Sequence, residues 1–190
     1  MHGCLSELFH IRILFFIFLA VKDPKLIHSR LNLKEQDKAQ KIFNILAWPG
    51  IFVFLLIVPA LDFRYHWSDV PVWLVIIAAI IMILGIFMEL IVMTQNRYTS
   101  RIIEIREDQK VIDTGSYSVI RHPMYLYGSM VFCSMPLILG SVYAFIAMII
   151  LCPSIFIFRI INKEKVLKEN LKGYKEYMKK VKYTLIPYVR

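Results

Sequence analysis

The chain has 190 residues, of which 58% are hydrophobic, and its 23 Lys and Arg residues against 14 Asp and Glu residues give a net charge of +9. This apolar share is far above the roughly 45–50% that is usual in soluble domains, which argues against an ordinary soluble domain. The length fits one domain over 1–190, and three cysteines without CxxC spacing support neither a disulfide framework nor a zinc site.

The first three apolar segments differ in how well they fit a membrane span. Residues 8–21 are only 14 residues long and include His10 and Arg12, so they could form a short span, an interfacial helix or the remnant of a longer N-terminal region. Residues 43–61 carry no charge and residues 72–93 carry one. Both match the roughly 20-residue helix that crosses a hydrocarbon core.

Two further apolar segments, 126–140 and 142–158, follow each other almost directly. Gly140 and Ser141 lie between them and indicate a tight turn. We therefore predict an all-α integral membrane protein with about five transmembrane helices, the first one short and the last two forming a tight hairpin.

The basic residues predict the orientation in the membrane. If all five segments span, residues 22–41, 94–122 and 159–190 lie on one side and hold 21 of the 23 Lys and Arg residues. By the positive-inside rule this side is cytoplasmic, which places the N-terminus outside and the C-terminus inside. The positive charge then indicates topology rather than nucleic-acid binding, and the bilayer with its anionic headgroups is the expected partner.

The tail after residue 158 has the pattern of an amphipathic helix. Leu167, Leu171, Tyr174 and Met178 recur at helical spacing among lysines, and Gly173 interrupts the pattern. Taken alone, such a basic helix would lie on the inner leaflet.

The stretch 115–129, "GSYSVIRHPMYLYGS", places Arg121 and His122 directly before Pro123 and an apolar segment. Interfacial anchoring would explain such residues. However, Pro123 suits the first turn of a helix, which makes His122 its cap beside a helix N-terminus that favours negative charge. The stretch therefore predicts a position that favours negative charge, in addition to interfacial anchoring.

The hairpin brings a second polar group to the same membrane face. Arg159 leaves the second hairpin helix where His122 enters the first, and an arginine can hold a carboxylate or phosphate through two parallel hydrogen bonds. Asn162 and Lys163 follow on the same helical face. These residues predict an anion-binding pocket open to both cytosol and membrane.

The quoted stretch, the hairpin after it and the tail "GYKEYMKKVKYTLIP" resemble the isoprenylcysteine carboxyl methyltransferase family of integral-membrane enzymes and its phospholipid methyltransferase relatives. The resemblance is strongest over 96–187, which makes this the expected cofactor-binding and catalytic region, and it continues more weakly to about residue 8. It implies S-adenosylmethionine as methyl donor, a lipophilic acceptor with a carboxylate as accepting group, and a multi-pass protein of the inner membrane with its active site facing the cytoplasm.

The resemblance also assigns roles to individual residues. It implies that Arg159 positions the accepting carboxylate and that Glu164 belongs both to the catalytic residues and to the cofactor site. The implied cofactor contacts are Gln109, Lys110, Val111, Ile112, Tyr117, His122, Pro123, Met124, Tyr125 and Glu164.

Two positions depart from the family pattern. Family members commonly carry paired glutamates four and five residues after the arginine, whereas this chain has Lys163 and Glu164. They also often have an arginine before the final Leu-x-Pro, where this chain has Thr184. Both departures bear on whether the site is intact.

Alternatives remain open at this level. Membrane sterol reductases have a related hairpin and a similar RHP-type stretch but use NADPH, and a non-catalytic protein could retain the fold. The acceptor could also be a prenylated protein C-terminus, a small isoprenoid acid or a phospholipid amine.

Overall fold

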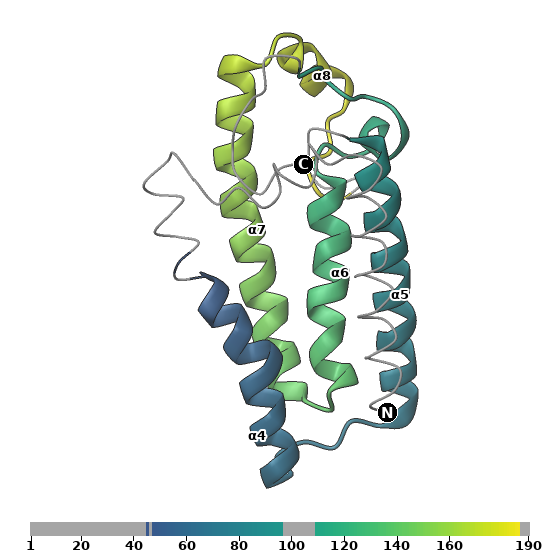
Figure 1. Cartoon of the computed structure of the whole chain (residues 1–190), viewed down its shortest axis with the longest axis vertical. Helices are drawn as coiled ribbons and strands as arrows, with labels where there is room; N and C mark the ends of the chain where they lie inside the picture. The colour runs from purple at the N-terminus through teal and green to yellow at the C-terminus, as the bar shows by residue number, and fades with distance from the viewer. Residues whose placement is uncertain (1–44, 46, 97–108, 187–190) are drawn as a thin grey trace, which may run out of the picture.

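The computed structural model describes residues 45, 47–96 and 109–186 (Figure 1). Within these ranges the secondary structure is helical apart from one isolated parallel bridge between Ile120 and Tyr183. The predicted all-α class is therefore confirmed. The first apolar segment at 8–21 lies outside the described residues, as does the basic stretch 22–41.

The helices run back and forth along one direction (Figure 1). In chain order they are η1 (Val53–Ile57, a π-helical turn), α4 (Val58–Tyr65), α5 (Val72–Gln95), η2 (Gly115–Ser118, a 3-10 turn), α6 (Pro123–Ile138), α7 (Val142–Asn170) and α8 (Tyr174–Lys180). By length and composition, three helical stretches of the described chain can cross a membrane: Ala47–Tyr65, Val72–Gln95 and Val142–Asn170. The apolar α6 has 16 residues and is shorter than these. The arrangement is that of a multi-pass membrane protein.

The predicted hairpin between α6 and α7 is confirmed. Gly140 adopts a φ of +84°, which favours glycine, and the Ser141 hydroxyl caps α7 by accepting the Ala144 N–H at 3.2 Å. The Asp62 carboxylate ties this turn to the end of α4. It accepts the Ser141 hydroxyl at 2.5 Å and both the hydroxyl and the N–H of Ser68, so its buried charge is hydrogen-bonded.

Aromatic side chains surround this end of the bundle. At least half of each of the following side chains is exposed: Phe63, Tyr65, Trp67, Trp73 and Tyr143. Such a belt is typical of a membrane–water interface. The opposite end, where α6 begins and α7 becomes polar, therefore lies at the other interface.

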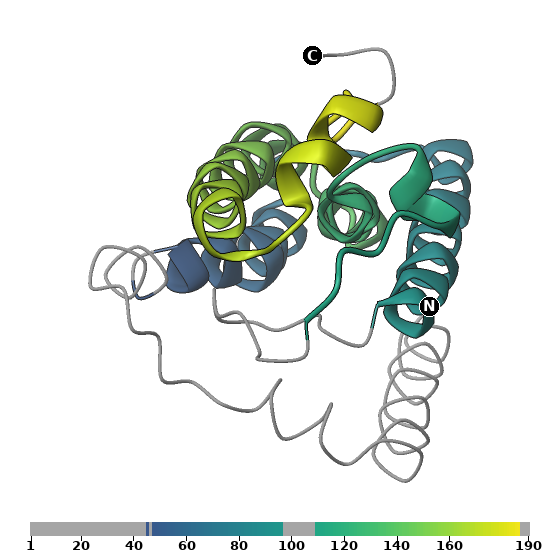
Figure 2. The same cartoon turned by 90° about the horizontal axis from the view of Figure 1, so that it is seen from above.

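The second helix of the hairpin continues well past its apolar part. Its apolar residues are 142–158, and residues 159–170 extend it by about 18 Å at 1.5 Å per residue. Gly173 then reverses the chain with a φ of +86°, and α8 folds back over the end of the bundle between α7 and η2 (Figure 2).

The apolar face predicted for the tail exists, but it packs against the protein. Gly173 divides the predicted helix into the end of α7 and the separate helix α8. The buried residues of this face form a small core together with Val111 and Met178: Leu167, Leu171, Tyr174, Tyr177 and Val181. The packing holds α8 over the site described below.

Candidate functional site

The site begins at the N-terminus of α6. His122 is the N-cap residue and Pro123 takes the first helical position, as the sequence predicted. Tyr117 lies in η2 just before them, and its carbonyl accepts the Tyr177 hydroxyl of α8 at 2.7 Å. The RHP stretch, with η2 just before it, therefore meets the distant helix α8 here.

The Arg121 guanidinium connects these segments. Its Nε donates to Glu164 Oε1 at 2.8 Å, and its Nη1 donates to the carbonyls of Val181 at 2.9 Å and Lys182 at 3.0 Å. Its Nη2 donates to the Thr184 hydroxyl at 2.6 Å. Thr184, one of the two departures from the family pattern, thus serves as an acceptor for Arg121.

Residues 181–184, which we call the C-terminal strap, also pair with the backbone of the RHP stretch. The Arg121 N–H donates to the Tyr183 carbonyl and the His122 N–H to the Thr184 carbonyl, each at 3.0 Å. An ion pair of 2.8 Å between Lys180 and Asp113 holds the residue just before the strap. The strap is therefore fixed by both backbone and side-chain bonds.

Glu164 lies on the polar extension of α7, beyond its apolar span. Its Oε1 accepts from Arg121 and lies 3.3 Å from His122 Nε2, while its Oε2 lies 3.5 Å from Lys168 Nζ. Burial alone would raise the pKa of this carboxyl, but the hydrogen bonds and charges of His122 and Arg121 outweigh burial and lower the pKa to about 2. Glu164 is accordingly ionised at neutral pH.

His122 is buried, with 5% of its surface exposed. Burial is the largest cause that lowers its pKa below the usual value; the hydrogen bond and charge of Glu164 oppose this effect, and the charges of Lys163 and Arg121 assist it. The ring is therefore neutral at pH 7. To donate a hydrogen bond to the Glu164 carboxylate, the neutral ring carries its proton on Nε2.

Because His122 is buried in its neutral form, we expect the stability of the folded protein to depend on pH. The unfolded chain takes up a proton as the pH falls through about 6.5, before the folded chain does, so stability falls by up to roughly 1.4 kcal/mol per pH unit below that value. We expect the melting temperature of the purified protein to drop between pH 7.5 and 5.5, and the drop to be smaller in His122→Gln. His66→Gln, at the exposed C-cap of α4, is the control. Equal drops in wild type and His122→Gln would contradict the account.

The other predicted cofactor contacts lie in two places, the first turn of α6 and the chain that leads to η2. Met124 and Tyr125 lie in the first turn of α6, and Lys163 Nζ lies 5.9 Å from the centroid of the Tyr125 ring. Val111 instead packs against the apolar core under α8, and Lys110 is exposed. Gln109 and Ile112 are half-buried in the chain leading to η2.

Arg159 lies at the start of the polar extension of α7 and is half-buried. The sequence correctly placed it at the same end of the hairpin as His122. The partner that the structure shows for His122 is Glu164, which lies further along the same helix.

The sequence analysis missed two residues at this site. One is Arg121 as the connecting side chain. The other is Tyr174, whose buried hydroxyl has no hydrogen-bond partner within the described part of the chain. Burial raises the pKa of Tyr174, and the negative charge of Glu164 raises it further. The polar residues at the start of an apolar segment hinted at Arg121, whereas the sequence indicated Tyr174 only as part of the apolar face of the tail.

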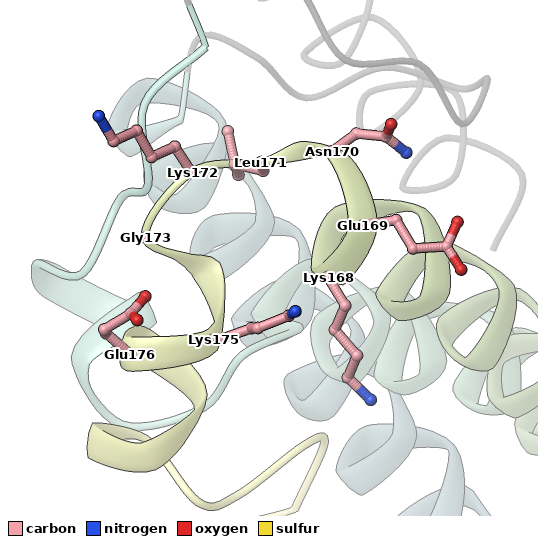
Figure 3. Close-up of a pocket in the computed structure, with 8 residues that line it drawn as sticks. All are labelled: Lys168, Glu169, Asn170, Leu171, Lys172, Gly173, Lys175 and Glu176. Carbon is pink, nitrogen blue, oxygen red and sulfur yellow. The ribbon is translucent and has the colours of Figure 1, made fainter.

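A hollow of about 340 Å³ lies nearby at the corner between α7 and α8 (Figure 3). It is lined by Lys168, Glu169, Asn170, Leu171, Lys172, Gly173, Lys175 and Glu176. In Figure 3 the Lys175 side chain runs across the corner, whereas Lys172 and Glu169 point away in opposite directions. None of these lining residues belongs to the RHP stretch, and Lys168 is the one among them that contacts Glu164. We therefore assign the site to the RHP stretch and its partners rather than to this hollow.

Comparison with known proteins agrees with this architecture. The structure of the eukaryotic intramembrane Ras methyltransferase ICMT (isoprenylcysteine carboxyl methyltransferase) matches with a TM-score of 0.63 at 22% identity, over 96% of this chain and 63% of that one. The chain thus has the fold of an integral-membrane methyltransferase and spans less than two thirds of that protein's length.

The sequence itself matches the family model for phospholipid methyltransferase over residues 73–173, more than half of the chain. The chain therefore belongs to the phospholipid methyltransferase family. A search of curated proteins found no match.

Proposed function

We propose that the protein is an S-adenosylmethionine-dependent methyltransferase that methylates a carboxylate on a lipophilic acceptor. The observation that carries the proposal is the cluster of Arg121, His122 and Glu164 at the point where the hairpin leaves the apolar region. It occurs in a chain of a methyltransferase family, at the boundary that a lipid-borne acceptor must reach.

The polar groups of this cluster fit the cofactor. S-adenosylmethionine supplies an electrophilic methyl group on a sulfonium and also carries an ammonium and a carboxylate. Glu164 Oε2 faces only the partly exposed Lys168 among the described residues and can receive a cation. The buried Tyr174 hydroxyl can hydrogen-bond a ligand that enters here. In this proposal the remaining contacts come from the predicted residues Gln109, Lys110, Ile112, Tyr117, His122, Pro123, Met124 and Tyr125.

The chain has to orient the acceptor rather than activate it. A carboxylate with a reference pKa of about 3.5 is ionised at neutral pH and needs no base. Arg159 is suited to bind it through two parallel hydrogen bonds. The surrounding apolar side chains exclude water, so catalysis consists mainly of positioning.

We also propose that this end of the bundle faces the cytoplasm, because the polar extension of α7 and α8 carry exposed lysines. Single cysteines at Asp69 and Lys179, both exposed, should react from opposite sides of the membrane in a cysteine-free background. Reaction of both with an impermeant reagent outside intact cells would reject this orientation.

The proposed activity is tested with the purified protein and S-adenosylmethionine labelled in its methyl group. We expect label to enter a lipid extract as base-labile methyl ester, and the cofactor to raise the melting temperature. A rise with NADPH instead would support a reductase. A folded protein that responds to neither would support a non-catalytic role.

A further inference from the structure

Four aromatic rings from three helical stretches form a continuous series below the site, which we call the aromatic ladder: Tyr125, Phe156, Phe132 and Trp48. Successive ring centroids are 5.2, 6.2 and 6.5 Å apart. Phe156 is buried, Tyr125 and Phe132 are half-buried, and Trp48 is 52% exposed. The ladder therefore leads from the polar corner into the apolar part of the bundle and presents one edge to the surroundings.

Lys163 stands at the polar end of this ladder. Its Nζ lies 5.9 Å from the Tyr125 ring, and that ring lies 5.9 Å from the His122 ring. The described residues give Lys163 no carboxylate within ion-pair distance, because the neighbouring Glu164 faces Arg121, His122 and Lys168. A half-buried cation that has no counter-ion within the described part of the chain favours an anionic ligand.

We propose that Lys163 is a specificity residue that binds the carboxylate head of the acceptor while the acceptor's apolar chain lies along the aromatic ladder. This inference rests on the proposed function and adds Lys163 to Arg159 as a group that recognises the acceptor's carboxylate. Arg159 lies one helical turn before Lys163 on the same face of α7, so both cations stand at the border between the apolar span and the polar extension.

The arrangement also separates substrate from product. Methylation would form a bond between a carboxylate oxygen and the methyl carbon and break the bond between that carbon and the sulfonium sulfur, which would leave as the neutral thioether of S-adenosylhomocysteine. No proton is transferred, and the ester that results is neutral. Lys163 attracts the acid and gains nothing from the ester, so we expect the site to hold the substrate more tightly than the product.

Binding can be measured without turnover. The full chain in nanodiscs of neutral lipid is loaded with the fluorescent cis-parinaric acid, which is then displaced by a 15-carbon isoprenoid acid or by its methyl ester. We expect wild type to prefer the acid, and Lys163→Gln to weaken acid binding on the order of tenfold with ester binding unchanged. Lys163→Arg should keep the preference.

The matched control is Lys165→Gln, which removes the same charge from an exposed position two residues further on. It should bind the acid like wild type. Acid binding that is unchanged in Lys163→Gln, or reduced equally in Lys165→Gln, would overturn the inference.

Cofactor binding to the same samples separates this inference from the proposed function. If S-adenosylmethionine binds Lys163→Gln as it binds wild type while acid binding falls, the inference is supported. If cofactor affinity falls and acid binding does not, Lys163 serves the cofactor and the inference is wrong. Absence of cofactor binding to wild type would instead refute the proposed function.

Discussion

Arg121→Met is expected to release the C-terminal strap and to lower the stability of the folded protein by about 3–5 kcal/mol, the usual cost of removing one partner of a buried ion pair. The change leaves the buried Glu164 carboxylate without its closest cation and removes the donors that bind the carbonyls of Val181 and Lys182 and the hydroxyl of Thr184. A lower melting temperature and faster proteolysis near residues 181–184 would show both effects.

Two variants make the result specific to this position. Arg64→Met removes an exposed arginine at the opposite end of the bundle, where it lies over the Tyr65 ring, and should melt like wild type. Arg121→Lys retains the charge but not the planar fork of donors, and should fall between wild type and Arg121→Met. A melting temperature of Arg121→Met equal to that of wild type would refute the connecting role of Arg121.

Glu164→Gln is expected to weaken S-adenosylmethionine binding by about a hundredfold, or about 2.7 kcal/mol. The amide keeps the size of the side chain but removes the negative charge that would face the cofactor's ammonium in a partly desolvated site, where charge interactions exceed those in water. Calorimetric titration of the purified variants measures the loss.

The control for this change is Glu169→Gln, which alters an exposed carboxylate five residues further along α7. Its affinity should equal that of wild type. If Glu164→Gln also binds the cofactor normally while melting at a lower temperature, Glu164 only anchors Arg121 and His122, and the cofactor's charged end is bound elsewhere.

The features that the sequence predicted correctly depend on local physics. A proline after a capping residue identifies a helix start, and this located His122 and Pro123 at the beginning of α6. Glycine between two apolar segments predicts a turn, and Gly140 provides it with a left-handed conformation. The ends of the hairpin then had to meet, which brought the RHP stretch close to the residues after 158.

The features that the sequence did not reveal depend on contacts between distant residues. Arg121 meets Glu164 across 43 positions and Thr184 across 63, and no spacing rule connects them. The periodicity of the tail correctly predicted an apolar face, but periodicity does not say what covers that face. A membrane surface and the protein's own chain can cover such a face equally well, and the structure shows that Val111 packs against it.

The most direct test of a cofactor site at this corner is ultraviolet crosslinking of labelled S-adenosylmethionine to the purified protein, followed by mapping of the labelled peptide. This measurement needs no knowledge of the acceptor. The account predicts label within residues 109–125 or 159–177 and its loss in the presence of excess unlabelled cofactor. Label confined to residues 45–95, or no label on a protein with a normal melting transition, would contradict it.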